Sequence, residues 1–196
     1  MADLLTIWNM ALGHIGEAVM VTDPVENTVQ SQSCARFWEG DRDAVLAAHP
    51  WAFAERTLTA AGYEPAPHPW AFAYRLPPSA IAVRRVVPAC GAHDAPSVPW
   101  ARGGVTAADG VEIDLILTDQ PLAWIAYTRR VEQVDRYPPA FVDALAWRLA
   151  WSICIPLSRS QETRQLCWQV YQQRLATAAV IDARQRREAD PMARPL

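Results

Sequence analysis

Two acidic residues, Glu112 and Asp114, alternate within the run VEIDLIL and are the first candidates for chemistry in this 196-residue chain. Alternation of polar and apolar residues indicates a β-strand, and neighbours on one face of a strand lie about 6.6–7 Å apart. Inverting glycosidases hold their two catalytic carboxylates at a comparable separation. Acidic residues also alternate on strands simply to keep one face solvated. The pair therefore leaves open both a glycan hydrolase and an ordinary exposed strand face.

Other patterns typical of catalytic or metal sites are missing from the sequence. Gly103 and Gly104 are not followed by the glycine and lysine of a phosphate-binding loop. No serine or cysteine lies in a nucleophile elbow. The histidines and cysteines show neither an H-E-x-x-H nor a C-x-x-C spacing, which argues against a metal site and a disulfide framework; they are His14, His49, His68, His93, Cys34, Cys90, Cys154 and Cys167. We expect reduced thiols, no cofactor, no metal and no enzyme activity.

Arginine and tryptophan are unusually prominent in the composition. All 18 basic residues are arginines, nine residues are tryptophans, and the formal net charge is −3. That charge provides no general basic field for gathering nucleic acid. Arginine stacks on aromatic rings, and both residue types are enriched at interface hot spots. Genome composition accounts for the arginines equally well, and core packing accounts for several tryptophans, notably Trp147, Trp151 and Trp168. An assembly surface and a packed core both remain open.

One segment, residues 139–157, is apolar enough to suggest a membrane span. It contains Asp143 and Arg148, and each charge would cost about 2.5–3.5 kcal/mol at the centre of a bilayer. We therefore predict a core helix that is covered on several sides, and no membrane partner. The first basic residue is Arg36, so we also expect no secretory signal at the start of this sequence.

Helical periodicity occupies the beginning and the end of the chain. Residues 3–15 show helical spacing and stop at Gly16. Residues 25–48 predict a second helix, bent or broken near Gly40 and ending before Pro50. After residues 139–157, a last helix begins at a Ser158 or Ser160 cap with Glu162 in its first turn. Its apolar stripe consists of Cys167, Tyr171, Leu175 and Ala178.

Between these helices the period changes to that of β-strands. The runs WAFAYRLP, AIAVRRVV, VEIDLIL and LAWIAYTRRV predict strands, and Asp109-Gly110 predicts a tight hairpin into the third run. We place Val111, Ile113, Leu115 and Leu117 on one face of that strand and Glu112 and Asp114 on the other. The predicted fold is α+β: an antiparallel helical bundle of residues 1–60 and 132–190, an inserted small antiparallel sheet domain of residues 61–131, and an extended tail of residues 191–196.

The phrase HPWAFA occurs twice, at residues 49–54 and 68–73. A repeat architecture needs at least three stacked units, and no third copy follows at this spacing. The first copy lies where a predicted helix ends, and the second opens a predicted strand. We expect the same six residues to take two different environments.

Four longer phrases occur in a characteristic order: NMALGHIGE, RDAVLAAHPWAFA, PWAFAYRLPPSAIAVRRV and LAWIAYTRRVEQVDRYPPAFVDALAWRLAWSICIPLS. In this order the chain resembles the tail tubular protein A family of short-tailed bacteriophages, from about residue 9 to residue 180. The phrases are specific as a set, although each alone is weak. That family also uses one phrase at the helix exit and a related phrase at the strand entry.

The resemblance implies a structural virion protein of the phage neck and tail, assembled in the host cytoplasm. It implies a head–tail adaptor that forms a ring of about twelve copies between the portal and the distal tail or nozzle protein, with DNA passing through the lumen without specific binding. By position, it assigns Arg184, Arg186, Arg187, Pro191, Met192, Arg194, Pro195 and Leu196 to the portal side. It assigns loops around Arg84, Arg85, Trp100 and Arg102 to the distal side.

The basic C-terminal run allows two interpretations. Its arginines are balanced by Asp182, Glu188 and Asp190, and cations near a helix C-terminus complement the helix dipole. A tail after Pro191 that becomes ordered only on a partner is the alternative. The competing function for the whole protein is a tail-associated peptidoglycan hydrolase that uses Glu112 and Asp114.

Overall fold

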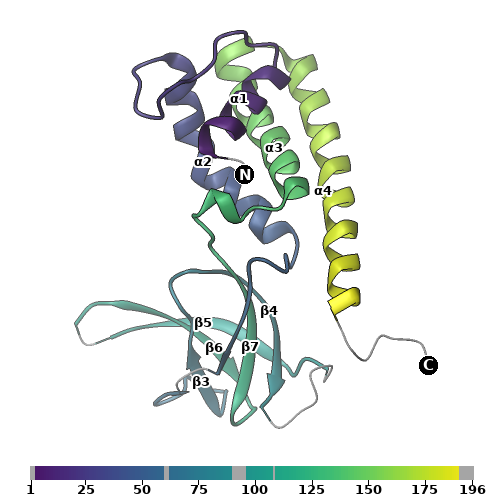
Figure 1. Cartoon of the computed structure of the whole chain (residues 1–196). Coiled ribbons are helices and arrows are strands. Elements are labelled where there is room, and N and C mark those ends of the chain that lie inside the picture. The colour runs from purple at the N-terminus through teal and green to yellow at the C-terminus, as the bar shows by residue number, and fades with distance from the viewer. Residues whose placement is uncertain (1–2, 60–61, 90–95, 108, 190–196) are drawn as a thin grey trace. The chain divides into compact units, whose positions relative to one another are not determined.

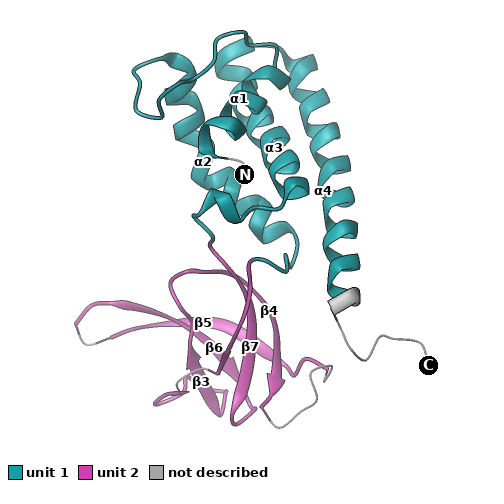
Figure 2. Cartoon of the chain, viewed as in Figure 1, with its two compact units in different colours: residues 1–53, 131–196 teal, residues 54–130 magenta. Residues whose placement is uncertain are grey.

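The computed structural model describes residues 3–59, 62–89, 96–107 and 109–189. The chain divides into two compact units, residues 1–53 with 131–196 and residues 54–130 (Figure 2). The first is helical and the second contains two antiparallel sheets, so the predicted α+β class is confirmed. The division falls at residues 53/54, and the segment 54–59, which the sequence analysis placed with the helices, belongs to the β unit.

The helical unit contains four described α-helices and one short 3₁₀ helix (Figure 1). They are α1 (Leu4–His14), α2 (Val29–Ala48), η1 (Val134–Arg136), α3 (Pro139–Ser158) and α4 (Gln161–Ala189). α3 packs against each of the other three α-helices. Its nine buried residues include Phe141, Leu145, Leu149 and Ile153. The prediction of a central core helix is therefore correct.

The ends of these helices follow local capping rules. Asp3 accepts a hydrogen bond from the Thr6 N–H at 2.7 Å and caps α1. After α1, Gly16 adopts the left-handed backbone conformation with φ +79°, and the Glu17 N–H donates a hydrogen bond to the Leu12 carbonyl at 3.0 Å. Of the two serines predicted to cap the last helix, Ser160 does so, because its hydroxyl accepts from the Thr163 N–H at 3.1 Å.

The second helix differs from its prediction in two ways. It begins at Val29 with Thr28 as its cap, not at residue 25, and it continues through Gly40 without a break. Glycine in a helix interior costs only about 0.5–1 kcal/mol relative to alanine. Trp38 and Asp41 are buried on either side of Gly40, and their packing accounts for a helix that continues through this glycine.

Both charges within α3 are paired inside the helical unit. Arg148 Nε lies 2.8 Å from Asp41 Oδ1 of α2, and Asp143 Oδ2 lies 3.3 Å from Arg174 Nε of α4. Among the described helices, α3 is the one that is long and apolar enough to cross a membrane. Half of its most apolar stretch of 18 residues is buried inside the protein. The ion pairs give its charges protein partners, which agrees with a core helix.

His14, at the end of α1, makes the unit's stability depend on pH. Its ring stacks on Trp147 with centroids 3.7 Å apart, and burial lowers its pKa below the ordinary value of 6.5, with Asp143 acting to raise the pKa and Arg174 to lower it. The folded state thus favours neutral His14. Stability from this group is present above pH 6.5 and is lost as the pH falls through the lowered pKa.

We therefore expect His14→Phe to flatten the acid side of the stability curve. Phenylalanine keeps the stack on Trp147 but cannot take up a proton. The free energy of unfolding in urea, measured between about pH 7 and pH 5, should fall less steeply in this variant than in the wild type. His68→Phe, at an exposed histidine, is the matched control and should leave the slope unchanged. Equal slopes for wild type and His14→Phe would contradict the assignment.

The β unit contains seven described strands in two antiparallel sheets. One sheet has the order β1-β7-β4 and the other β2-β3-β6-β5. The strands are β1 (Glu55–Thr59), β2 (Gly62–Tyr63), β3 (Phe72–Arg75), β4 (Ala80–Pro88), β5 (Trp100–Thr106), β6 (Glu112–Thr118) and β7 (Ala123–Arg129). The sequence predicted the longer strands and missed β1 and β2. It also predicted one sheet where the structure has two.

The predicted hairpin joins β5 to β6. Thr106 pairs with Glu112, the Gly110 N–H donates to the Ala107 carbonyl at 2.9 Å, and Gly110 has φ +83°. An Asp-Gly pair favours this turn because glycine reaches positive φ without steric cost. The hairpin prediction is confirmed.

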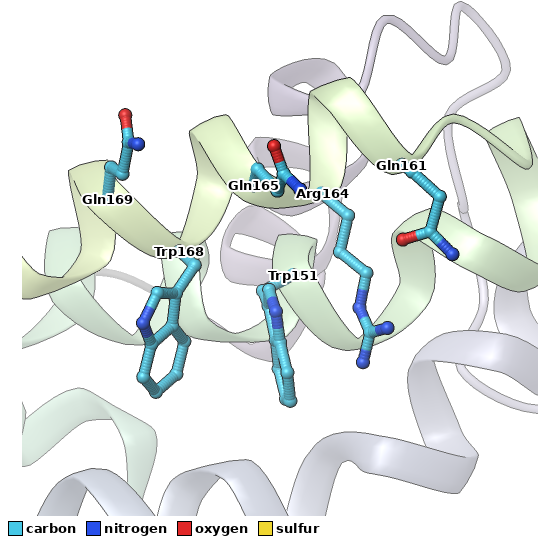
Figure 3. A pocket seen from close by; sticks show the side chains of 6 residues that line it. All are labelled: Trp151, Gln161, Arg164, Gln165, Trp168 and Gln169. Carbon is cyan, nitrogen blue, oxygen red and sulfur yellow. The ribbon is translucent and has the colours of Figure 1, made fainter.

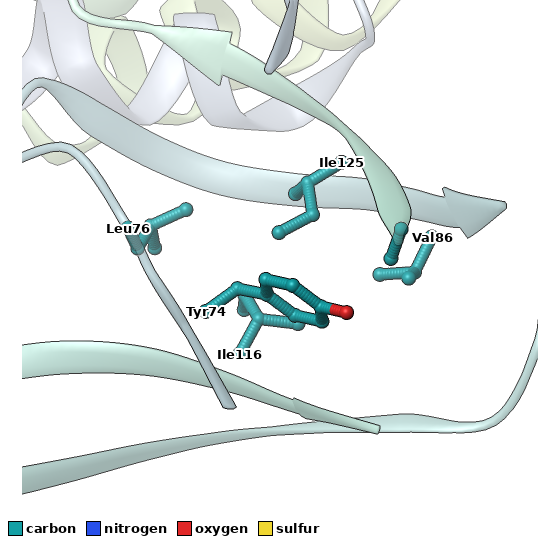
Figure 4. Close-up of a cluster of buried hydrophobic side chains, with 6 residues drawn as sticks. Tyr74, Leu76, Val86, Ile116 and Ile125 are labelled. Atoms are coloured by element: carbon teal, nitrogen blue, oxygen red, sulfur yellow. The ribbon is translucent and has the colours of Figure 1, made fainter. Parts of the chain in front are cut away.

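Both faces of β6 are covered towards its C-terminal end. Ile116 packs with Tyr74, Leu76, Val86 and Ile125, so that side chains of the two sheets point toward one another (Figure 4). On the other face, Leu115 and Leu117 form a second cluster with Ala73. Of the four apolar residues predicted on one face, Leu115 and Leu117 are buried, whereas Val111 is 55% exposed. The alternation is lost because a second sheet buries the opposite face.

The two HPWAFA copies occupy different environments, as predicted. In the first copy Trp51 is 1% exposed in the helical unit, where its ring meets Phe141 edge-on at 5.1 Å. In the second, Trp70 is half-buried and packs beside the Leu115 and Leu117 cluster of the β unit. Identical local sequence thus gives a full core position in one unit and a partly covered one in the other.

Three cysteines, Cys34, Cys154 and Cys167, are free and buried, and Cys90 lies outside the described residues. Burial raises the pKa of Cys34 to about 12 and that of Cys167 to about 11. A thiol with so high a pKa is a poor nucleophile at neutral pH. These two cysteines therefore serve as small core residues.

Candidate functional site

Arginine and tryptophan side chains gather on one surface of the helical unit. Arg148 and Trp151 are three residues apart on α3, and Arg164 and Trp168 are four apart on α4, so each pair shares a helix face. Arg36 of α2 lines the same hollow as Arg148, Trp151 and Arg164. We call these five residues the arginine–tryptophan surface.

Trp151 is the centre of this surface. The guanidinium carbons of Arg148 and Arg164 each lie 4.6 Å from the centroid of its ring. Arg148 also lies 5.4 Å from the ring of Trp168, and the two indole rings are 5.1 Å apart. Cations within about 6 Å of a tryptophan face are attracted by its quadrupole, by about 0.5–1 kcal/mol at exposed sites. The stacking therefore holds both guanidinium groups in defined positions.

The base of the surface contains a buried ion pair. Asp41 is 4% exposed, and its Oδ1 accepts from Arg148 Nε at 2.8 Å. Burial raises the pKa of Asp41 above its ordinary value, while hydrogen bonds from Ser152 and Arg148 act in the opposite direction. Arg148 is thus held by a carboxylate on one side and aromatic rings on the other. Arg164 differs, because its Nε is buried without a hydrogen-bond partner among the described residues.

A groove runs along these residues. One hollow of about 420 Å³ is lined by Trp151, Arg164 and Trp168 together with three glutamines of α4. In Figure 3 the two indoles and the Arg164 guanidinium project to the same side of α3 and α4. A second hollow of about 590 Å³ shares Trp151 and Arg164 and extends to Arg36 and Phe37 of α2. We call the two adjoining hollows the arginine–tryptophan groove; its chemistry suits an acidic and apolar protein segment.

The residues expected on the portal side are only partly described. Arg184 is exposed, whereas Arg186 Nε donates to Asp182 Oδ2 at 3.1 Å. α4 includes Arg187, whose side chain lies outside the described part of the structure, as do Pro191, Met192, Arg194, Pro195 and Leu196. Asp182 also accepts from the Ala52 N–H at 3.0 Å, which ties α4 to the exit of α2. Arg186 therefore has a structural contact within the chain.

The residues expected on the distal side lie on strands and not in loops, which corrects the sequence analysis. Arg84 and Arg85 are on β4, and Trp100 and Arg102 are on β5. β4 and β5 are edge strands of different sheets. The Val98 N–H donates to the Val86 carbonyl at 2.9 Å, so the segment entering β5 runs beside β4. Arg84 Nε donates to Thr128 Oγ1 at 2.8 Å, and Trp100 packs on the core between the sheets.

Glu112 and Asp114 both lie on the exposed part of β6 and line a hollow of about 500 Å³ in the β unit. Each carboxylate is engaged by β5. Glu112 accepts from the Thr106 hydroxyl at 2.6 Å, and Asp114 accepts from Arg102 Nη2 at 2.9 Å. These contacts give both residues a role in pairing the two strands.

Arginine and tryptophan are prominent as residue types in the sequence, and Arg36 and Arg148 were named there for other reasons. None of Arg36, Arg148 and Arg164 was predicted as a site residue. The available signal was the helical spacing of arginine from tryptophan on each of two helices. Which of these faces meet was not visible in the sequence, because it depends on how α2, α3 and α4 pack.

Among the described residues, no group of three or more histidine, cysteine or acidic side chains is arranged to hold a metal ion. The sequence matches no protein-family model and no curated protein.

Proposed function

We propose that this chain is a structural head–tail adaptor of a short-tailed bacteriophage. In this role, identical copies form a ring, with about twelve as the expected number, between the portal and the distal tail or nozzle protein. The ring supports tail assembly, and DNA passes through its lumen. Neither a cofactor nor a catalytic residue is part of the proposal.

The first support is the ordered set of sequence phrases that resembles the tail tubular protein A family. A second is the α+β organisation, in which a β unit is inserted between the helices of another unit. The net charge of −3 also suits a channel for DNA, since each phosphate neutralised by arginine would hold the nucleic acid in place.

The observation that carries the proposal is the arginine–tryptophan surface. Trp168 is 38% exposed, although tryptophan in a self-sufficient monomer is mostly covered. Arg164 stacks on Trp151, and its Nε forms no hydrogen bond in the described structure. Stacked arginine and tryptophan at the centre of a hollow are typical of interface hot spots. A ring of identical copies needs such a surface on every subunit.

Negative-stain microscopy tests the proposal. The protein at micromolar concentration, alone and mixed with the portal protein from the same genome, should give rings of one fixed copy number. Sedimentation velocity on the same samples should show one large species. A chain that stays monomeric and does not bind the portal would contradict the adaptor role.

The alternative function, a tail-associated peptidoglycan hydrolase, is favoured by the hollow that Glu112 and Asp114 line. A zymogram with the double variant Glu112→Gln and Asp114→Asn tests it. Clearing by the wild type that disappears in the variant supports the hydrolase. Absence of clearing by the wild type, or clearing that survives both substitutions, rejects it.

A further inference from the structure

The loop between α1 and α2 carries exposed apolar side chains and acidic side chains on one short segment. Three of its large apolar side chains are exposed to solvent: Val19 at 51%, Met20 at 67% and Val25 at 87%. The same loop carries Glu17, Asp23 and Glu26, and no arginine occurs before Arg36. We call residues 17–27 the acidic loop. Exposed apolar side chains next to like charges are typical of a segment that contacts a partner.

Side-chain contacts hold the acidic loop in a defined shape. Asn9 of α1 pairs with the backbone of Val21 through two hydrogen bonds, of 2.8 and 2.9 Å, and Val21 is buried. Glu26 accepts from the hydroxyls of Thr22 and Thr28 at 3.1 and 2.9 Å. A preorganised loop loses little conformational entropy on binding. Its apolar side chains are therefore displayed ready for contact.

The acidic loop and the arginine–tryptophan groove are complementary. The groove is lined by Arg36, Arg148 and Arg164, against one carboxylate, Asp41. The loop presents three carboxylates and no basic group. In Figure 1 the loop projects from the helical unit on the side away from α4, the helix that carries Arg164 and Trp168. A head-to-tail contact needs two complementary surfaces on different parts of each subunit, and the loop and the groove meet this requirement.

We infer that the acidic loop of one copy docks into the arginine–tryptophan groove of the next copy. This inference rests on the proposed ring and names the surfaces that build it. Met20 and Val25 pack against Trp151 and Trp168, and the loop carboxylates face Arg36 and Arg164. The apolar contacts supply most of the affinity, while the opposite charges set the register and speed association. Because loop and groove are different surfaces, the contact repeats from copy to copy.

Two double variants test the contact from its two sides. Met20→Arg with Val25→Arg places cations on the loop at exposed positions. Arg36→Glu with Arg164→Glu reverses the net charge of the groove from basic to acidic. Each variant alone should associate with itself at least about tenfold more weakly than the wild type. The loop variant loses its apolar contacts and places cations beside Arg36 and Arg164, and the groove variant sets carboxylates against the carboxylates of the loop. Val180→Arg, which adds charge at a 52% exposed position of α4 outside the groove, is the matched control and should assemble normally.

Mixing the two variants gives the sharper readout. The groove variant keeps an intact loop and the loop variant keeps an intact groove, so an equimolar mixture should form a dimer with one contact and no ring. Sedimentation velocity, with circular dichroism to verify folding, measures all of these species. A mixture of folded variants that stays monomeric overturns the inference.

The outcomes separate this inference from the proposed function. Rings that persist in both double variants keep the adaptor role and overturn the loop–groove contact. Wild-type chains that form open filaments, dispersed by both variants, support the contact and contradict the closed ring. A wild-type chain that is monomeric with and without the portal overturns both.

Discussion

Replacing Trp51 with alanine is expected to destabilise the protein by about 3–5 kcal/mol, the usual cost of removing a fully buried aromatic side chain. Trp51 is 1% exposed and packs edge-on against Phe141. Its Nε1 also donates to the Val45 carbonyl at 2.8 Å. Val45 lies in the last turn of α2, where carbonyls lack intrahelical partners, so the indole completes that helix end. Urea denaturation followed by far-UV circular dichroism measures the loss.

The second HPWAFA copy provides a matched control. Trp70→Ala makes the same chemical change in the same six-residue context, but Trp70 is only half-buried. The loss should be about half of that for Trp51 or less, because the transfer energy scales with the apolar area that is buried. Equal losses for the two variants would show that local sequence, and not burial, decides the effect.

Replacing Arg148 with methionine is expected to cost about 3–5 kcal/mol, because it leaves the buried carboxylate of Asp41 without its charged partner. Asp41 is 4% exposed, and its Oδ1 forms an ion pair with Arg148 Nε at 2.8 Å. Adding Asp41→Asn to Arg148→Met should recover most of the loss, since the double variant buries no charge. The free energies of unfolding of the two single variants and the double variant complete the cycle.

The loss of stability caused by Arg148→Met should decrease as the pH falls. Burial raises the pKa of Asp41, so the folded state favours its protonated form, and stability from this group is present at low pH and lost as the pH rises through the raised pKa. The free energy of unfolding that Arg148→Met removes should therefore be smaller at about pH 4 than at about pH 7, because Asp41 is then increasingly protonated and needs no charged partner. A penalty that is constant with pH would mean that lost packing on Trp151 causes the effect.

Local sequence was sufficient for the end of α1 and for the β5–β6 turn, and it narrowed the cap of α4 to two serines. Gly16 ends α1, Ser160 caps α4, and Asp109-Gly110 turns β5 into β6, because each depends on dihedral angles or hydrogen bonds within a few residues. The α+β class followed from the change of hydrophobic period along the chain. The strand β1 was missed because the first HPWAFA copy and the residues after it resemble the end of a helix.

The sequence by itself determined the approximate positions of the four long helices and of the longer strands, that the central helix is a core helix, and that arginine and tryptophan are abundant enough for an interface. Only the tertiary structure decided that Ile116 is buried by a second sheet, and that Arg148, Trp151 and Arg164 meet at one groove. The physical reason is distance along the chain. Periodicity fixes which face of an element is apolar, whereas the packing of faces more than a hundred residues apart, such as Asp41 with Arg148, is decided by the whole core.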